Sequence, residues 1–163
     1  MAPNLRAKLV RAKVPPKPPS RPRRVIPGMK KCGKNCPACP YIQPGRTFKA
    51  SATTYKVDLN CEVDCESKNI CYAISCAKVR CKEQYIGQTG RSLRERFVQH
   101  LNYVDRDKEA TGKHFNLPGH SKNDINLTII EKIHKRDVWT REEIESMHIR
   151  KANSFHKGIN LKP

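Results

Sequence analysis

Two short segments near the middle of the chain alternate weakly between hydrophobic and polar positions, which is the period-two pattern of a β-strand. They cover residues 70–76 and 83–88, and both are rich in strand-forming residues. The stretch between them, residues 77–82, suits a turn, so the two segments predict a β-hairpin. A further run at residues 126–133 (Asn-Leu-Thr-Ile-Ile-Glu-Lys-Ile) predicts another strand.

Apolar residues then recur every four positions, which is the spacing of one face of an α-helix. This pattern predicts a helix over residues 93–103, with Ser92 or Thr89 as its N-cap. The apolar residues are Leu93, Phe97 and Leu101. A last helix is predicted over residues 140–152, opened by a capping box that starts at Thr140.

The predicted elements follow one another in the order β-β-α-β-α, with a polar loop at residues 105–112 after the first helix. This order predicts an α/β fold, a small domain with a three-stranded antiparallel sheet flanked by helices. Gly158-Ile159-Asn160 closes the domain.

The chain of 163 residues is strongly basic, with a formal net charge of +18 at pH 7. Residues 1–31 hold ten Lys or Arg and no acidic residue, which leaves +8 for residues 32–163. Because attraction to phosphates is long-ranged and independent of sequence, we expect DNA, or RNA, as the partner. A ribosomal-type or simply soluble basic protein is the alternative. No stretch approaches the roughly 18 apolar residues of a membrane span, so we expect no membrane partner.

Proline and cysteine content divides the chain into three parts. Residues 1–31 contain seven of the twelve prolines and can bury little, which predicts a basic, Pro-rich, disordered linker. Residues 32–65 form a Cys-rich region, and residues 66–163 hold the predicted strands and helices of the domain.

Eight cysteines in a chain of this size indicate either disulfides or bound metal. Charged residues interrupt the apolar positions at the N-terminus, which therefore lacks the hydrophobic stretch of a secretory signal. We predict reduced, metal-binding cysteines, with disulfides as the alternative.

The tightest cysteine cluster has the spacing C-x3-C-x2-C and comprises Cys32, Cys36 and Cys39. Glycine and proline between the thiols suit the tight turns of a metal knuckle. A tetrahedral Zn²⁺ site needs a fourth ligand, and either Cys61 or Cys65 can supply it. Free thiols or a regulatory disulfide are the alternatives to structural zinc.

A second set of four nitrogen and sulfur ligands combines Cys76-x4-Cys81 with His114-x5-His120. This is the composition of a closed structural Zn²⁺ site. Such a site would join the hairpin turn to the loop after the first helix. Because the two pairs are far apart in sequence, their spacing alone leaves this site a hypothesis.

Side chains of the predicted hairpin and first helix indicate phosphodiester chemistry. Tyr72 and Tyr85 lie on paired strands, and Arg96 and His100 are one helical turn apart on one face. A guanidinium can hold a non-bridging phosphate oxygen and stabilise developing negative charge. Gly87 ends the second strand, where backbone can approach a ligand closely. Sheet aromatics, a surface arginine and a packing histidine are the alternatives.

The last predicted helix supplies a carboxylate for a divalent ion. Mg²⁺ and Mn²⁺ take oxygen ligands and keep several waters, so one carboxylate can anchor them. Glu145 is the leading candidate, and Glu142 and Glu143 are rivals on the same helix.

Taken in order, these residues resemble the motifs of the GIY-YIG endonuclease family, most closely the endonuclease module of Penelope-like retroelements. The residues that support the resemblance are Tyr72, Tyr85-Ile86-Gly87, Arg96, His100, Glu145 and Asn160. Ile70-Cys71-Tyr72 stands where the family has Gly-Ile-Tyr, and the Penelope-like branch generally lacks that glycine. Residues 4–13 and the Cys32 knuckle are similar to the segment that joins reverse transcriptase to endonuclease in those elements.

The resemblance implies a divalent-metal-dependent DNA endonuclease that nicks one strand and leaves a 3′-hydroxyl, as in target-primed retrotransposition. Tyr72 is then the candidate general base, and Tyr85 orients the water or the phosphate. A free tyrosine has a pKa of about 10, so Arg96, the metal or nearby lysines must lower it before Tyr72 can act as a base. Alternatively Tyr72 only positions the water, and the sequence leaves open which tyrosine takes which role. Arg96 holds the phosphate, and His100 bonds the Tyr85 hydroxyl or a phosphate. Glu145 holds Mg²⁺ or Mn²⁺ in the register of the family.

The same resemblance assigns Gly87 and Asn160 to the substrate-binding part of the site, with Asn160 ordering the site by bonding backbone. The branch pairs its two hairpin cysteines with two downstream histidines. It further implies a reverse transcriptase domain as partner in a full-length element, and nuclear localisation. The alternative is a non-catalytic, zinc-stabilised nucleic-acid-binding module.

Overall fold

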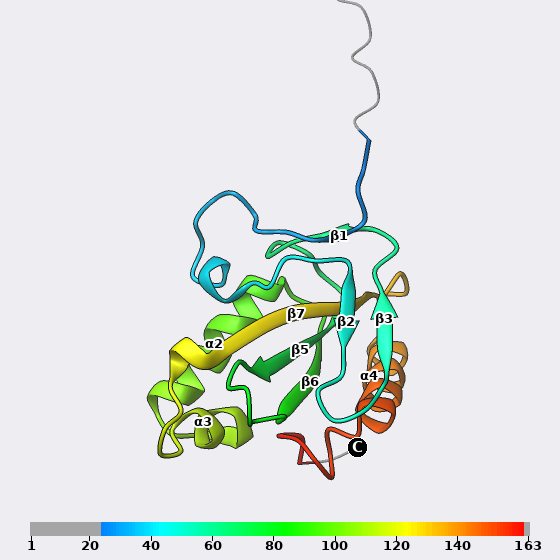
Figure 1. The fold of residues 1–163 in the computed structure, drawn as a ribbon. Coiled ribbons are helices and arrows are strands. Elements are labelled where there is room, and N and C mark those ends of the chain that lie inside the picture. Colours follow the sequence, from blue (N-terminus) through cyan, green and yellow to red (C-terminus); the bar gives the residue numbers. More distant parts are fainter. Residues whose placement is uncertain (1–23, 162–163) are drawn as a thin grey trace, which may run out of the picture.

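A three-stranded antiparallel sheet forms the centre of the molecule (Figure 1). The computed structural model describes residues 24–161. Strand β5 (Ile70–Cys76) lies between β6 (Gln84–Thr89) and β7 (Ile125–Lys132) and pairs antiparallel with both. The predicted hairpin and third strand are therefore confirmed, and the fold is α/β.

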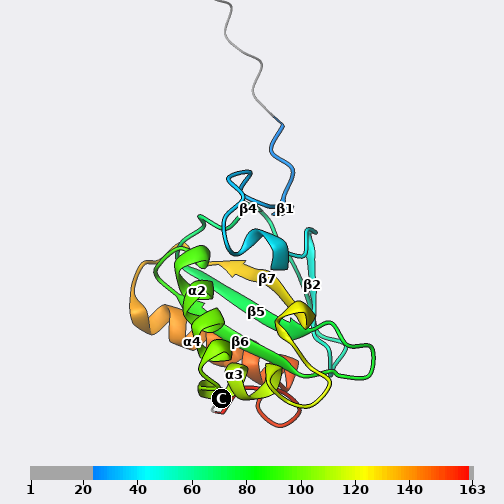
Figure 2. The same cartoon turned by 90° about the vertical axis from the view of Figure 1, so that its left-hand side faces the viewer.

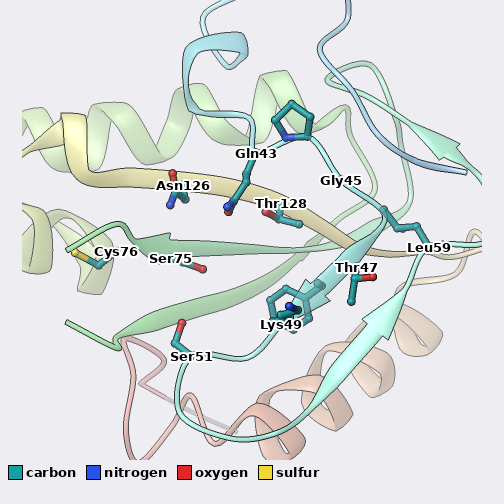
Figure 3. A pocket seen from close by; sticks show the side chains of 12 residues that line it. Gln43, Gly45, Thr47, Lys49, Ser51, Leu59, Ser75, Cys76, Asn126 and Thr128 are labelled. Atoms are coloured by element: carbon teal, nitrogen blue, oxygen red, sulfur yellow. The ribbon is translucent and has the colours of Figure 1, made fainter. Parts of the chain in front are cut away.

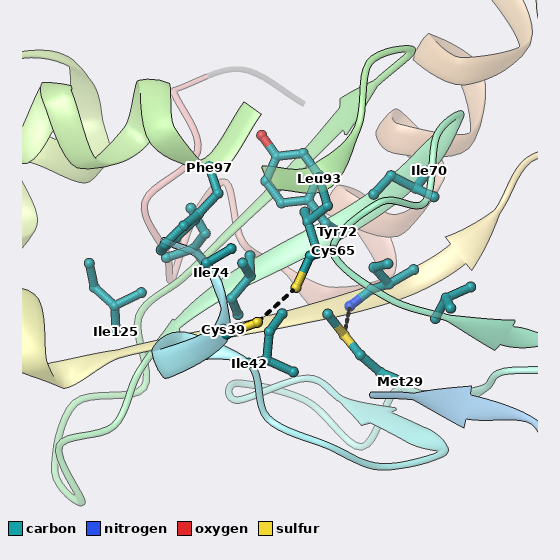
Figure 4. Close-up of a cluster of buried hydrophobic side chains, with 14 of the residues drawn as sticks. Met29, Cys39, Ile42, Cys65, Ile70, Tyr72, Ile74, Leu93, Phe97 and Ile125 are labelled. Carbon is teal, nitrogen blue, oxygen red and sulfur yellow. Dashed lines mark hydrogen bonds between the residues drawn. The ribbon is translucent and has the colours of Figure 1, made fainter. Parts of the chain in front are cut away.

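Alternate residues of β5 point to opposite faces of the sheet, as the period of two requires. Ile70, Tyr72 and Ile74 pack against α2 (Leu93–Asp105) and the Cys-rich segment, as Figure 4 shows. Cys71 and Ala73 pack in a second cluster, with residues of α4 (Val138–Ala152). The two helices thus cover opposite faces, with α2 in front of the sheet and α4 behind it in Figure 2.

Capping explains where the helices begin. Ser92 is the N-cap of α2, in a capping box with Glu95, so one of the two proposed caps is confirmed. The predicted start of α4 is wrong: the helix begins at Val138, because the Asp137 side chain accepts the Thr140 N–H and caps it. The predicted polar loop at residues 105–112 is wrong at its end, where α3 (Glu109–Phe115) begins.

The N-terminal part adds four short strands and a turn of 3-10 helix. Strands β1 (Gly28–Met29) and β4 (Glu62–Val63) pair in parallel, and β2 (Thr47–Lys49) and β3 (Lys56–Asp58) form an antiparallel pair. The 3-10 turn is η1 (Cys39–Tyr41), and a second one, η2 (Lys122–Asp124), precedes β7.

The Cys-rich segment packs directly on the domain. Ile42 bridges to Leu127 at the outer edge of β7, and the Ile129 N–H donates to the Met29 sulfur at 3.0 Å. Met29 falls within the predicted linker of residues 1–31, yet it is buried in the core. Residues 1–23 of that predicted linker lie outside the described residues. In the described part of the chain, no helix combines the length and the apolar character needed to cross a bilayer.

Candidate active site and metal centres

A hydrogen-bonded cluster on the α2 side of the sheet brings together three of the predicted site residues. The Tyr72 hydroxyl accepts a hydrogen bond from Arg96 Nε at 3.0 Å and lies 2.7 Å from His100 Nε2. His100 Nδ1 lies 3.2 Å from the Thr111 hydroxyl on α3. Of the two partners expected for His100, the Tyr85 hydroxyl is therefore wrong: His100 bonds Tyr72 and makes an edge contact with the Tyr85 ring, while a bond to phosphate stays a prediction.

Burial determines the protonation of this cluster. Burial, reinforced by Tyr85, raises the pKa of Tyr72 well above its ordinary value, although Arg96 opposes the shift. Burial also raises the pKa of Tyr85, again against the effect of Arg96. Burial and then Arg96 lower the pKa of His100 to about 3, so its imidazole is neutral near pH 7. The protein groups alone therefore keep both phenols protonated, so Arg96 by itself does not lower the pKa of either tyrosine below its ordinary value.

Gly87 is required by the two tyrosine rings. A Cβ at this position would lie 2.8 Å from the Tyr72 hydroxyl and 2.8 Å from Tyr85 Cε1. Real Cβ atoms essentially never approach other atoms so closely. The close approach expected at Gly87 thus involves the tyrosine rings of the protein itself.

The free edge of β6 positions Glu145 and Asn160. The Asn160 side chain accepts the Ile86 N–H at 2.8 Å and donates to the Ile86 carbonyl at 2.7 Å, which replaces a partner strand. Two residues further along this edge, Glu145 Oε1 accepts the Gln88 N–H at 3.1 Å. These bonds satisfy an edge that would otherwise be open. They also bring a carboxylate from α4 around the edge of the sheet, and Asn160 bonds backbone as expected.

One cavity of about 460 Å³ collects most of these groups. Its lining includes Tyr85, Arg96, His100, Glu145 and Asn160. It also includes Tyr103, Glu109, Ala110, Thr111, Ile149 and Leu161. Tyr72 is fully buried beneath it and is absent from the lining.

The cavity separates Glu145 from its rivals. Glu142 and Glu143 are exposed on α4 and do not line the cavity, whereas Glu145 is partly buried in its wall. Burial raises the pKa of Glu145, while the Gln88 N–H and Arg96 oppose the shift. A partly desolvated carboxylate beside a guanidinium is a suitable place for a cation and a phosphate together.

The prediction missed two polar residues of this cavity, Thr111 and Glu109. Both belong to α3, which is short and contains Gly112, so the sequence resembled a loop. No periodic pattern signalled them. The hydrogen bond between His100 and Thr111 depends on how α3 packs against α2.

The N-terminal cysteines form a group that could hold a metal such as zinc. The sulfur atoms of Cys32, Cys36, Cys39 and Cys65 all lie within 4.8 Å of one another. Three of the S···S distances are 3.4, 3.6 and 3.7 Å. Tetrahedral zinc with Zn–S bonds of about 2.3 Å requires S···S distances of about 3.8 Å, so the donors fit. Between the two candidates for the fourth ligand, the structure selects Cys65, and Figure 4 shows it facing Cys39.

The pKa values of these thiols indicate why a cation is favourable there. The backbone of Lys34 lowers the pKa of Cys32 to about 7. Burial raises the pKa of Cys36 and of Cys65. Buried thiolates this close together need a positive charge between them, which a divalent metal supplies.

The predicted second set also comes together. Cys76, Cys81, His114 and His120 place their ligand atoms within 4.8 Å of one another. Cys81 Sγ lies 3.7 Å from His114 Nε2, close to the roughly 3.6 Å that tetrahedral zinc requires of an S and N pair.

The surroundings of this second set suit a metal. Glu83 Oε2 lies 3.0 Å from His114 Nδ1. A metal-bound histidine typically has such a carboxylate at its other ring nitrogen, and this arrangement leaves His114 Nε2 for the ion. Both ring nitrogens of His120 are buried and have no hydrogen-bond partner among the described residues. The set joins the β5–β6 turn to α3 and its following loop.

All eight cysteines are described, and none of them is in a disulfide. Cys71 lies on β5, outside both groups of metal ligands, and packs with residues of α4; burial raises the pKa of its thiol well above the ordinary value.

A second cavity, of about 370 Å³, lies between the β2–β3 pair and the outer part of the sheet (Figure 3). Polar side chains such as Gln43, Asn126 and Thr128 project into it. Its lining has no carboxylate and no imidazole, so it is not a candidate for metal-assisted hydrolysis.

Comparison with known proteins gives no assignment: the chain matches no protein-family model, no curated protein and no solved structure. The fold and site therefore define an α/β domain with a group of four cysteines suited to a metal such as zinc.

Proposed function

We propose that this protein is a divalent-metal-dependent DNA endonuclease of the GIY-YIG type, related to the endonuclease module of Penelope-like retroelements. The observation that supports the proposal best is the single cavity in which Tyr85, Arg96 and Glu145 meet. Pure binding of nucleic acid would not need a partly buried carboxylate next to the phosphate site, because such a group repels phosphate.

Arg96 and Glu145 take complementary roles. Arg96 Nε is occupied by the Tyr72 hydroxyl and Nη1 donates to Gln99 Oε1 at 2.9 Å, which leaves Nη2 to hold a non-bridging phosphate oxygen. The interaction strengthens as negative charge develops on the phosphorus oxygens. Glu145 would hold Mg²⁺ or Mn²⁺ through its carboxylate, and the bound ion would supply Lewis-acid stabilisation of that charge.

We assign the two tyrosines different roles. Tyr85 lines the cavity, so it is the phenol that can contact and orient the attacking water. Tyr72 is fully buried and bonds both Arg96 and His100, so it acts as a positioning residue. This assignment separates two roles that the sequence leaves open.

The proposed reaction is hydrolysis of the bond between phosphorus and the 3′-oxygen. The water oxygen bonds to phosphorus, the P–O3′ bond breaks, and the water protons end on the 3′-oxygen and on solvent. The products are a 3′-hydroxyl and a 5′-phosphate. Such a 3′-end could prime reverse transcription, which agrees with a reverse transcriptase domain as partner and with a nuclear site of action.

Two zinc ions would have a structural role in this proposal. The four-cysteine set would hold the N-terminal segment on the β5–α2 side of the sheet, and the second set would hold α3 against the β5–β6 turn. Neither set contributes a residue to the lining of the candidate active site.

The test is conversion of supercoiled plasmid to nicked circle with Mg²⁺ or Mn²⁺. We expect Glu145→Ala and Arg96→Ala to abolish nicking. Glu142→Ala and Glu143→Ala are the matched controls, since these residues belong to the same helix but lie outside the cavity, and both variants should retain it. Nicking that persists in both Glu145→Ala and Arg96→Ala refutes the site.

The tyrosine assignment is tested in the same assay. Tyr85→Phe should lower the rate at saturating metal, whereas Tyr72→Phe should mainly weaken substrate binding through a displaced Arg96. Equal losses of the same kind in both variants would contradict the separate roles.

The second candidate function is a non-catalytic nucleic-acid-binding module stabilised by zinc. It is favoured by the observation that Glu145 and Asn160 already bond the edge of β6, a purely structural use of both groups. It predicts salt-dependent DNA binding, no nicking with any divalent metal, and a Glu145→Ala variant that binds DNA as well as the parent chain.

A further inference from the structure

One large aromatic side chain of the domain lies almost entirely in solvent. Trp139, on the first turn of α4, has 82% of its surface exposed, and the chain contains no other tryptophan. The neighbouring Val138 is 51% exposed. Exposure of an indole to water is unfavourable, and tryptophan is among the residue types most enriched where a partner is bound.

A buried arginine holds several chain segments together at the start of α4, the helix that carries this tryptophan. Arg141, two residues further along α4, donates from Nε to Gln88 Oε1 at 3.0 Å and from Nη1 to the Arg136 carbonyl at 2.9 Å. Arg141 Nη1 also lies 3.3 Å from Asn69 Oδ1. A Cβ at Gly90 would lie 3.2 Å from its guanidinium carbon. Arg141 therefore draws these chain segments together at the start of α4, two residues along the helix from Trp139.

Each of these segments carries an exposed cation at, or next in sequence to, a residue that contacts Arg141. Arg136 bonds Arg141 directly, and its neighbour Lys135 is exposed. Lys68 precedes Asn69 and Arg91 follows Gly90, and both are exposed. None of these four cations is in an ion pair within the described residues. We call Trp139 with Lys68, Arg91, Lys135 and Arg136 the Trp139 surface.

The Trp139 surface is directly connected to the candidate active site. Gln88 bonds Arg141 with its side chain and Glu145 with its backbone N–H. Arg141 and Glu145 are four residues apart, on one face of α4, which Figure 2 shows behind the sheet. A nucleic acid whose phosphate occupies the cavity can therefore continue over this surface.

We propose that the Trp139 surface binds the DNA next to the cleaved phosphate, with the indole stacked on a nucleobase and the four cations on neighbouring phosphates. The inference rests on the proposed function, because it extends the path of the same substrate. Base–aromatic stacking tolerates any sequence, since every base has a π-face. The surface thus favours a distorted or single-stranded segment, whose bases are accessible.

Two acidic residues of α4 restrict where the backbone of the bound DNA can lie. Glu142 and Glu143 are exposed on the turn that follows Trp139 and would repel phosphates. The backbone of the bound strand must therefore follow the β7–α4 loop and Arg91, with its bases toward the indole.

The test uses the intrinsic fluorescence of the chain's single tryptophan, measured in a Glu145→Ala variant so that the DNA stays intact. Oligonucleotides of single-stranded, gapped and fully paired DNA are added while their binding is followed separately by fluorescence anisotropy of a dye on the DNA. We expect strong quenching at saturation, and tightest binding to the gapped DNA. Trp139→Ala should weaken binding by about 5- to 150-fold, the range measured for one stacked base.

Two controls separate stacking from charge. Phe155→Ala removes another exposed aromatic, one that is outside the Trp139 surface, and should leave affinity unchanged. Trp139→Ala should keep the salt dependence of binding, whereas Arg136→Ala should reduce its slope by about 0.9.

DNA binding without quenching, or a Trp139→Ala variant that binds as tightly as its parent, would overturn the inference and leave the proposed function intact. Quenched binding by a wild-type chain that never nicks DNA would overturn the endonuclease and support the Trp139 surface. Absence of binding to every DNA would overturn both.

Discussion

Gly87→Ala is the most direct test of how the two tyrosine motifs fit together. The added Cβ would lie 2.8 Å from the Tyr72 hydroxyl, 2.8 Å from Tyr85 Cε1 and 2.9 Å from Tyr72 Cζ. Relaxed contacts between such atoms are about 3.5–4.0 Å, so the Tyr72 ring must retreat by roughly 0.6 Å or more. Tyr72 has no exposed surface, so its ring can retreat only by displacing its neighbours.

The cost follows from what this displacement disrupts. Overpacking of a buried site costs about 1–3 kcal/mol. A shift of this size also stretches the bonds from Tyr72 to Arg96 and His100, now 3.0 and 2.7 Å, and each is worth about 1 kcal/mol. Alanine regains about 0.5–1 kcal/mol over glycine in a strand. The free energy of unfolding should therefore fall by roughly 2–4 kcal/mol, by the sum of these effects.

Urea denaturation of the zinc-loaded protein measures this loss, with Gly90→Ala as the matched variant. Gly90 is exposed, and its Cβ would lie 3.2 Å from the Arg141 guanidinium, a contact that requires a shift of only a few tenths of an ångström, compared with 2.8 Å at Gly87. Combining Gly87→Ala with Tyr72→Phe should cost less than the two changes separately, because the hydroxyl in conflict is gone. A Gly87→Ala variant no less stable than Gly90→Ala would refute the proposed crowding.

Two further predictions concern metal and pH. Cys65→Ser should lose one equivalent of zinc in elemental analysis, and with it most of the stability that zinc gives. Cys61 lies outside the group of four sulfur atoms, so Cys61→Ser should keep both equivalents. Equal zinc contents in the two variants would contradict the selection of Cys65. His100 has a pKa of about 3 in the folded state and about 6.5 in the unfolded state. Between these two pH values the unfolded state binds more protons, so the free energy of unfolding falls as the pH drops. The fall is at most about 1.4 kcal/mol per pH unit. Unfolding free energies of His100→Gln should fall less steeply over the same range, and parallel curves would show that His100 is not the group responsible.

The sheet was accessible from the sequence because its pattern is local. Strand formers in residues 70–76 and 84–89 leave few alternatives to a hairpin, and Ser92 with Glu95 marks a helix start in four residues. The start of α4 was predicted wrongly because the sequence there offers two N-caps. Asp137 and Thr140 are both good cap residues three positions apart, and only the structure shows that Asp137 caps.

The site was accessible only in part. The choice between Cys61 and Cys65 depends on tertiary contacts, because the Cys65 carbonyl accepts the Arg94 N–H at 2.9 Å and so holds Cys65 at the start of α2. Helix α3 gave no periodic signal. Its Gly112 is needed because a Cβ there would lie 2.3 Å from the Tyr103 carbonyl oxygen, a constraint set by the packing of α3 on α2.

Helix α3 also links the second set of metal ligands to the candidate active site. His114 and Thr111 lie one turn apart on α3, and Thr111 contacts His100, which in turn bonds Tyr72 and thereby orients Arg96. Glu145 is held by a different route, through the Gln88 N–H at the edge of β6. Loss of metal from this set should therefore displace Arg96, the arginine proposed to bind phosphate, while Glu145 stays in place, because Arg96 depends on the position of α3 and Glu145 does not.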